Sequence, residues 1–207
     1  MTQVKICGIC SPQDGLAAVK AGATAIGLVF WPQSPRAIDV ETARAIVKAL
    51  PDGVPAVGVF VNEEVDVIND TIRRAGLFGV QLHGDERHDV IAAIRRPVVR
   101  ALRMTERESI AELPSTATLL LDADDRERRG GTGQAIDWVE AARIAQSRPT
   151  VLAGGLTPAN VAQAIRIVRP YGVDVSSGVE SRLRVKDEAA MKAFVAAVRR
   201  GDEERVA

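Results

Sequence analysis

A thiol and a carboxyl group each stand at the end of an apolar run that is typical of a buried strand. Cys7 lies within the β-branched run at residues 4–9, and Asp122 directly follows the leucines at residues 119–121. A thiolate can act as a base or a nucleophile, and a desolvated carboxyl group can hold a proton for delivery as a general acid. The pair therefore predicts acid–base chemistry. The simpler alternatives are a small buried hydrophobe at position 7 and a helix cap or loop-bracing hydrogen bond at position 122.

Two loops rich in glycine and serine provide a candidate anion site. Gly154 and Gly155 follow the apolar residues 150–153, and the sequence Ser176, Ser177 and Gly178 follows residues 173–175. Glycine lets the backbone approach a ligand closely, and the free amides at a helix start favour an anion. We interpret the two loops as a phosphate site, with tight turns as the alternative. A weaker glycine-rich stretch at residues 130–133 would serve as a lid or place amides near an anion.

Two further polar side chains lie near predicted strand ends. Arg36 is the one cation in the loop at residues 31–38 and can grip a carboxylate through two hydrogen bonds. His83 ends the run at residues 79–82, where a lone histidine more often has a structural hydrogen bond than a catalytic role. His88 is expected on the surface, and Cys10 is expected to have no special role.

The elements that must position these groups repeat as strand and helix along the chain. Strands are predicted at residues 4–9, 24–30, 56–60, 79–82, 98–102, 118–121, 150–153 and 173–175, with helices at 14–22, 39–50, 64–75, 87–95, 106–113, 137–146, 158–168 and 186–199. An open doubly wound sheet usually has fewer strands, and no linker separates the units. The pattern therefore favours an α/β fold in which residues 1–207 form a single (β/α)8 TIM barrel. In such a barrel the loops after the strands share one face, so the candidate residues converge there.

Composition points to a small-molecule partner. Lysine plus arginine and aspartate plus glutamate both number 27, so no net charge would draw nucleic acid or an anionic membrane. The sequence has no run of eighteen apolar residues and no secretory signal pattern, which predicts a cytoplasmic location.

The cysteines and histidines are too few for several other classes of site. Cys7 and Cys10 form a C-x-x-C pair, but a thioredoxin-like pair belongs at a helix start, whereas Cys7 lies in a strand pattern. With only two histidines the chain is a poor supplier of metal ligands, so we predict no metal site.

An ordered set of short segments runs along the chain at residues 5–9, 30–36, 58–62, 80–84, 120–122, 130–133, 153–156 and 174–180. Together these segments resemble the phosphoribosylanthranilate isomerase family of tryptophan biosynthesis. The resemblance implies a (β/α)8 barrel without a cofactor. It also implies an Amadori rearrangement of N-(5-phosphoribosyl)anthranilate to 1-(2-carboxyphenylamino)-1-deoxyribulose 5-phosphate.

The same resemblance implies a role for each candidate residue. The general base would be Cys7 and the general acid Asp122. Substrate would be held by Arg36, His83, Asp174, Gly154, Gly155, Ser176, Ser177 and Gly178. Leu183 and Arg184 replace the Pro-Gly that the family usually has, which leaves the conformation of the last loop open. Lys5 is expected to point away from Cys7, so the sequence identifies no group that lowers the pKa of the thiol.

Two other functions remain compatible with the sequence. One is a barrel that binds a phosphorylated ligand without turnover, because fold alone does not establish catalysis. The other is a different phosphosugar isomerase or epimerase. Monomer and homodimer are equally compatible with the apolar stripes of the predicted outer helices.

Overall fold

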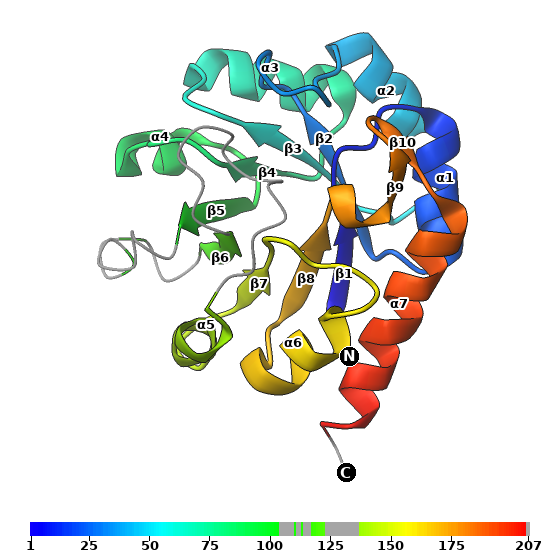
Figure 1. Ribbon diagram of the computed structural model, residues 1–207. Coiled ribbons are helices and arrows are strands. Elements are labelled where there is room, and N and C mark those ends of the chain that lie inside the picture. Colours follow the sequence, from blue (N-terminus) through cyan, green and yellow to red (C-terminus); the bar gives the residue numbers. More distant parts are fainter. Residues whose placement is uncertain (104–109, 111–112, 114–116, 123–136, 206–207) are drawn as a thin grey trace.

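Eight parallel strands close into a barrel in the order of the chain (Figure 1). The structure is a computed structural model that describes residues 1–103, 110, 113, 117–122 and 137–205. The strands are β1 (Gln3–Ile6), β2 (Ala25–Val29), β3 (Ala56–Phe60), β4 (Gly79–Leu82), β5 (Val98–Arg103), β6 (Thr118–Asp122), β7 (Thr150–Leu152) and β8 (Gly172–Val175). β1 pairs with both β2 and β8, which closes the ring and confirms the predicted (β/α)8 fold.

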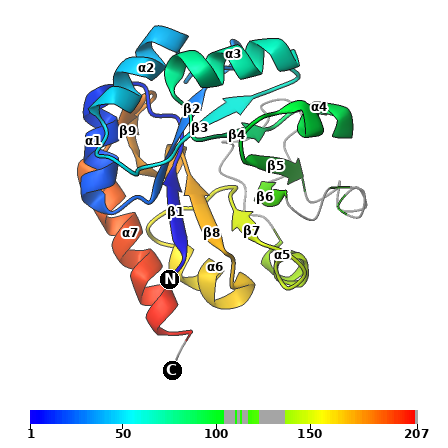
Figure 2. The same cartoon turned by 180° about the vertical axis from the view of Figure 1, so that it is seen from behind.

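Helices surround the barrel on its outside, as the two opposite views in Figures 1 and 2 show. They are α1 (Pro12–Ala21), α2 (Val40–Ala49), α3 (Val65–Ala75), α4 (His88–Ala93), α5 (Trp138–Ala145), α6 (Val161–Val168) and α7 (Glu188–Glu203). Several starts are fixed by a side chain that accepts a backbone hydrogen bond, as Ser11 does for α1 and Asp187 for α7. The predicted helix at residues 106–113 lies outside the described residues, apart from residues 110 and 113. None of the helices described here is both long and apolar enough to cross a membrane.

The last part of the chain departs from the prediction. A short 3-10 helix, η2 (Ser177–Val179), leads into an antiparallel hairpin of β9 (Glu180–Arg182) and β10 (Val185–Lys186). The predicted start of the final helix at Lys186 is therefore wrong, because that residue belongs to β10. The helix predicted from residue 158 also starts later, at Val161, since Asn160 accepts a hydrogen bond from the Thr157 amide in a turn before it.

Alternation along the strands separates an outer core from the barrel interior. Side chains such as Val4, Ile6 and Leu121 pack in the large core between strands and helices. Their neighbours in sequence point inward, where Ala101, Leu120 and Ala153 form a separate small cluster. Successive residues of a strand face opposite sides, so residues two apart share a side. This rule decides which polar groups meet inside the barrel.

Candidate active site

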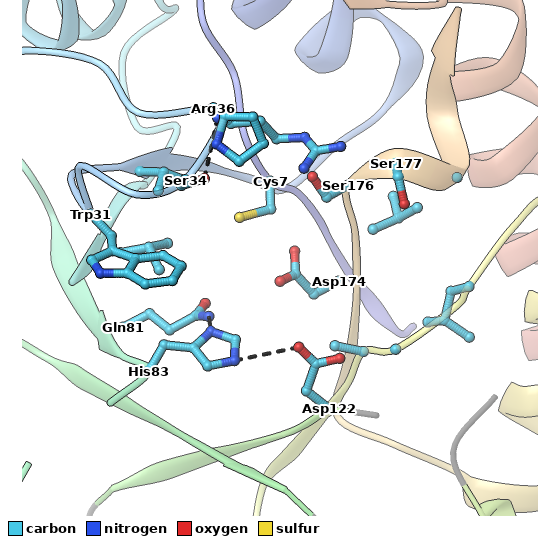
Figure 3. A pocket seen from close by; sticks show the side chains of 18 of the residues that line it. Cys7, Trp31, Ser34, Arg36, Gln81, His83, Asp122, Asp174, Ser176 and Ser177 are labelled. Carbon is cyan, nitrogen blue, oxygen red and sulfur yellow. Dashed lines mark hydrogen bonds and ion pairs between the residues drawn. The ribbon is translucent and has the colours of Figure 1, made fainter. Parts of the chain in front are cut away.

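A cavity of about 510 Å³ opens at the carboxyl ends of the strands. It brings together every sequence-predicted site residue: Cys7, Arg36, His83, Asp122, Gly154, Gly155, Asp174, Ser176, Ser177 and Gly178. Figure 3 shows the Cys7 sulfur, the Asp174 carboxylate and the Asp122 carboxylate directed into the same space. The convergence predicted from strand ends is therefore observed. The glycine-rich stretch at residues 130–133 lies outside the described residues.

Lys5 points into the barrel beside Cys7, which corrects the expectation that it points away. The two residues are two apart in β1 and its continuation, so they share the interior side. The Lys5 ammonium donates a hydrogen bond of 2.8 Å to Asp174 Oδ2. All three side chains are buried. A single buried cation thus lies between a thiol and a carboxyl group.

The charges in this group influence one another strongly. Burial raises the pKa of the Cys7 thiol, and the Lys5 ammonium acts in the opposite direction. Burial likewise raises the pKa of the Asp174 carboxyl group against the pull of Lys5. Burial opposes charge on Lys5 itself, but Asp174 and then Cys7 outweigh it, so the pKa of the amine lies above its usual value. Lys5 therefore remains an ammonium ion in this site.

Gly27 on the neighbouring strand makes room for the thiol and the lysine. A Cβ atom at position 27 would lie 2.6 Å from Cys7 Sγ and 3.0 Å from Lys5 Cε. Both atoms thus occupy the space over Gly27, which places them next to each other. A side chain larger than hydrogen at this position would displace them.

Asp122 is linked to His83 on the opposite side of the cavity. His83 Nε2 lies 3.4 Å from Asp122 Oδ2, and His83 Nδ1 lies 3.0 Å from Gln81 Nε2 (Figure 3). An amide donor at Nδ1 leaves the ring proton on Nε2, facing the carboxyl group. Gln81 and His83 are two apart in sequence, and both line the cavity.

Arg36 is held by a carboxylate of the protein. Its Nε and Nη2 donate to the two oxygens of Glu180, each at 2.7 Å. Lys186 binds the same carboxylate at 3.0 Å and the Ser176 carbonyl at 2.9 Å. Burial would raise the pKa of Glu180, but the hydrogen bond from Arg36 and the charge of Lys186 hold it below the usual value. The guanidinium therefore enters the cavity with one edge already bound.

The hairpin of β9 and β10 also contacts the loop that carries Arg36. Arg184 adopts a left-handed conformation with φ of 70° and donates through Nη1 to the carbonyls of Pro35 and Ala37, at 2.7 and 3.1 Å. Leu183 lines the cavity. Leu183 and Arg184 therefore form the turn between β9 and β10, and Arg184 adds a contact to the Arg36 loop.

The two glycine- and serine-rich loops adjoin each other at the cavity wall. Gly154 and Gly155 have positive φ angles of 78° and 65°, which side chains disfavour. A Cβ atom on Gly178 would lie 2.0 Å from the Leu156 carbonyl oxygen, so only glycine lets the loops meet. The Asn160 amide donates to the Gly155 carbonyl at 2.9 Å. Helix α6 starts at Val161, which is farther from the two glycines than predicted. The Asn160 side chain, rather than the helix start, therefore holds the glycine loop.

Several polar residues of the site were not among the predicted ones, including Lys5, Gln81, Glu180 and Lys186. The signal for the first two was available in the sequence, because each lies two residues before a predicted site residue in a strand. Glu180 and Lys186 lie in a hairpin of short strands that has no clear periodicity. Their pairing with Arg36 could be found only from the fold. Cys10, expected to have no special role, donates from its sulfur to the Gly8 and Arg36 carbonyls.

The closed barrel and the acid–base groups at its carboxyl end define a (β/α)8-barrel enzyme. Residues 4–197 match the family model for N-(5'-phosphoribosyl)anthranilate (PRA) isomerase. The chain belongs to this isomerase family. The curated N-(5'-phosphoribosyl)anthranilate isomerase of Geotalea daltonii is 46% identical over 197 residues, which cover 94% of this chain and 95% of the relative.

Solved structures agree with this membership. The crystal structure of phosphoribosyl anthranilate isomerase from Thermotoga maritima superposes with a TM-score of 0.88 at 41% identity, covering 96% of this chain and 99% of that one. A second structure of such an isomerase, in complex with reduced 1-(o-carboxyphenylamino)-1-deoxyribulose 5-phosphate, has a TM-score of 0.85 at 39% identity with the same coverage.

Proposed function

We propose that the protein isomerises N-(5'-phosphoribosyl)anthranilate to 1-(o-carboxyphenylamino)-1-deoxyribulose 5-phosphate in tryptophan biosynthesis. The observation that carries the proposal is that Cys7 and Asp122 line one cavity, with Asp174 lining it too. The family membership and the ligand of the related complex support the same substrate class.

The reaction needs one acid and one base. The substrate is an aminal whose sugar ring opens when its ring oxygen is protonated, and Asp122 supplies that proton. His83 Nε2 lies 3.4 Å from the Asp122 carboxyl group and helps to hold it in position. Ring opening leaves an imine conjugated with the anthranilate ring, which acidifies the hydrogen on the adjacent sugar carbon. Cys7 as thiolate removes that hydrogen, and the enolamine then tautomerises to the ketone.

The remaining residues hold the substrate. Arg36 binds the anthranilate carboxylate through the edge that Glu180 leaves available. The loops at Gly154–155 and at Ser176–Gly178 bind the phosphate through backbone amides and serine hydroxyls. Asp174 Oδ1 is buried and has no hydrogen-bond partner among the described residues, so it is an acceptor for a sugar hydroxyl.

The proposal is tested by assaying turnover of phosphoribosylanthranilate by the wild type and by the Cys7→Ala and Asp122→Ala variants. Each substitution removes one proton-transfer group and is expected to lower kcat by about 10²- to 10⁴-fold. Far-UV circular dichroism checks that the barrel is intact. A Cys7→Ala enzyme with near-normal turnover would remove the base assignment.

Two outcomes would favour the alternatives. Tight binding of the reduced product analogue without turnover would indicate a barrel that binds a phosphorylated ligand only. Activity on another phosphosugar, with failure to rescue a tryptophan auxotroph that lacks this step, would indicate a different isomerase or epimerase.

We also propose that residues 1–207 work as a single barrel domain in the cytoplasm. The Thermotoga maritima isomerase is dimeric, and monomers generated from it have been solved. For this chain, a monomer or a homodimer stays the prediction, which light scattering checks.

A further inference from the structure

We propose that Cys7 and Asp174 share one proton through Lys5, so that the thiolate forms when Asp174 becomes a carboxylic acid. The inference rests on the proposed function, because it names how the base of that reaction is generated. Lys5 is thereby a positioning residue, and Asp174 acquires a role as the store of the thiol proton in addition to any contact with substrate.

The geometry places the three groups in one line of contact. Lys5 Nζ lies 2.8 Å from Asp174 Oδ2, and Lys5 Cε and Cys7 Sγ lie within 3.0 Å of the same point over Gly27. The charge of Lys5 also acts on the thiol, because it lowers the pKa of Cys7 against the effect of burial. A proton can therefore pass along these contacts without leaving the protein.

Charge balance favours a shared proton over two ionised acids. One buried ammonium faces two acidic groups, and the Asp174 carboxylate raises the pKa of the Cys7 thiol. Ionising both would leave an uncompensated negative charge in a buried site, which is costly. Ionising one keeps the three groups neutral in total.

The other charged groups around the site leave this balance in place. Lys186 also favours the Cys7 thiolate, but less than Lys5 does, and its ammonium is bound to Glu180. Arg36 is bound to the same Glu180 carboxylate. The carboxylate of a bound substrate would offset the rest of the positive charge on Arg36. On the far side, Asp122 raises the pKa of Asp174 and His83 lowers it.

The proton transfer is balanced in atoms and charge. An N–H proton of the Lys5 ammonium passes to Asp174 Oδ2, and the S–H proton of Cys7 passes to the Lys5 nitrogen. The start is thiol, ammonium and carboxylate; the end is thiolate, ammonium and carboxylic acid. Lys5 is an ammonium ion in both states, in agreement with its raised pKa.

Alkylation of Cys7 by iodoacetamide as a function of pH tests the proposal without substrate. The background is Cys10→Ser, because the second cysteine would also react and does not line the cavity. Two coupled acids titrate in two steps, so the rate is expected to rise in two steps separated by a plateau. In Asp174→Asn the profile is expected to become a single step. Its midpoint should lie about one pH unit or more below the upper step, because Lys5 then faces the thiol alone.

Lys5→Met is expected to shift the midpoint of the alkylation profile upward by about one pH unit or more, because the thiol loses the neighbouring ammonium. This variant leaves Asp174 buried without a partner and can fail to fold. The double variant Lys5→Met/Asp174→Asn removes both charges and is expected to show one step at high pH. Thermal melting reports whether each variant folds.

A single step in the otherwise unmodified Cys10→Ser protein, or a midpoint raised by Asp174→Asn, would overturn the proton sharing. A raised midpoint would show that Asp174 only orients Lys5. These outcomes leave the proposed function intact, whereas the absence of isomerase turnover in the wild type would defeat that function whatever the alkylation profile.

Discussion

At the scale of single residues, several side chains of the site are held by partners that are far away in sequence. Arg36 illustrates this, because its position depends on Glu180, which is 144 residues away in sequence. Two charge-assisted hydrogen bonds at 2.7 Å fix the plane of the guanidinium. The substrate-binding edge of Arg36 is therefore oriented before a ligand arrives.

Replacing Glu180 with glutamine should weaken substrate binding more than it slows the chemistry. Hydrogen bonds to charged groups are worth about 1.5–3 kcal/mol, so KM is expected to rise roughly 10- to 100-fold with a smaller change in kcat. Steady-state kinetics measure both constants. Glu203→Gln, on the exposed face of α7, is the control and should change neither. A collapse of kcat at unchanged KM would show that Glu180 does not act through Arg36.

The sequence was sufficient to predict which residues meet but not how they are paired. Cys7, Asp122 and the glycine loops were found because each follows an apolar run, and parallel strands place such positions on one face. Lys5 was misassigned because its distance from Cys7 was treated as one residue rather than two. The partnership of Arg36 with Glu180 has no local signal, since it joins a loop near the start of the chain to a strand near its end.

At the scale of elements, the β9–β10 hairpin is the part of the fold that the sequence did not predict. Its strands have three and two residues, too few for an alternating pattern to be recognised. The eight barrel strands were predicted because each is a short apolar run and these runs alternate with helical patterns along the chain. The hairpin nevertheless reaches the Arg36 loop through Arg184.

Arg184→Gly and Arg184→Ala separate the contact from the backbone strain at this turn. Both remove the hydrogen bonds to Pro35 and Ala37, so both are expected to raise KM several-fold. Only alanine keeps a side chain in the left-handed conformation, which costs about 1–2 kcal/mol. The alanine variant should therefore melt about 2–8 °C below the glycine variant. Calorimetry and kinetics test this, and an unchanged KM in both variants would show that the hairpin does not position the loop.

At the scale of the whole molecule, the two ends of the chain are tied together on the side of the barrel away from the cavity. The Thr2 amide and hydroxyl donate to the Asp202 carboxylate at 2.8 and 2.6 Å, and Arg199 donates to the Thr2 carbonyl at 3.2 Å. Figures 1 and 2 show the start of β1 and the end of α7 at the same end of the molecule, with the β9–β10 hairpin at the other end in Figure 1.

Asp202→Ala should destabilise the barrel without affecting the site. Thr2 is buried, so its amide loses a partner that water cannot fully replace, at a cost of about 1–3 kcal/mol. The melting temperature is expected to fall by about 2–12 °C, with kcat and KM unchanged. Glu203→Ala, at the next and exposed position, is the control. An altered KM in Asp202→Ala would mean that this end of the barrel is coupled to the cavity.

The contact between Thr2 and Asp202 has a consequence for the way the chain can be connected. A short flexible peptide could join residues near these two positions without bending any strand, because the gap between them is already bridged by hydrogen bonds. A circularly permuted protein could have its new ends in a loop between a helix and the next strand, on the side of the barrel away from the cavity. Such a protein would enclose the same cavity. The eight strands form a closed ring, so the architecture of the barrel does not require the chain to begin at β1.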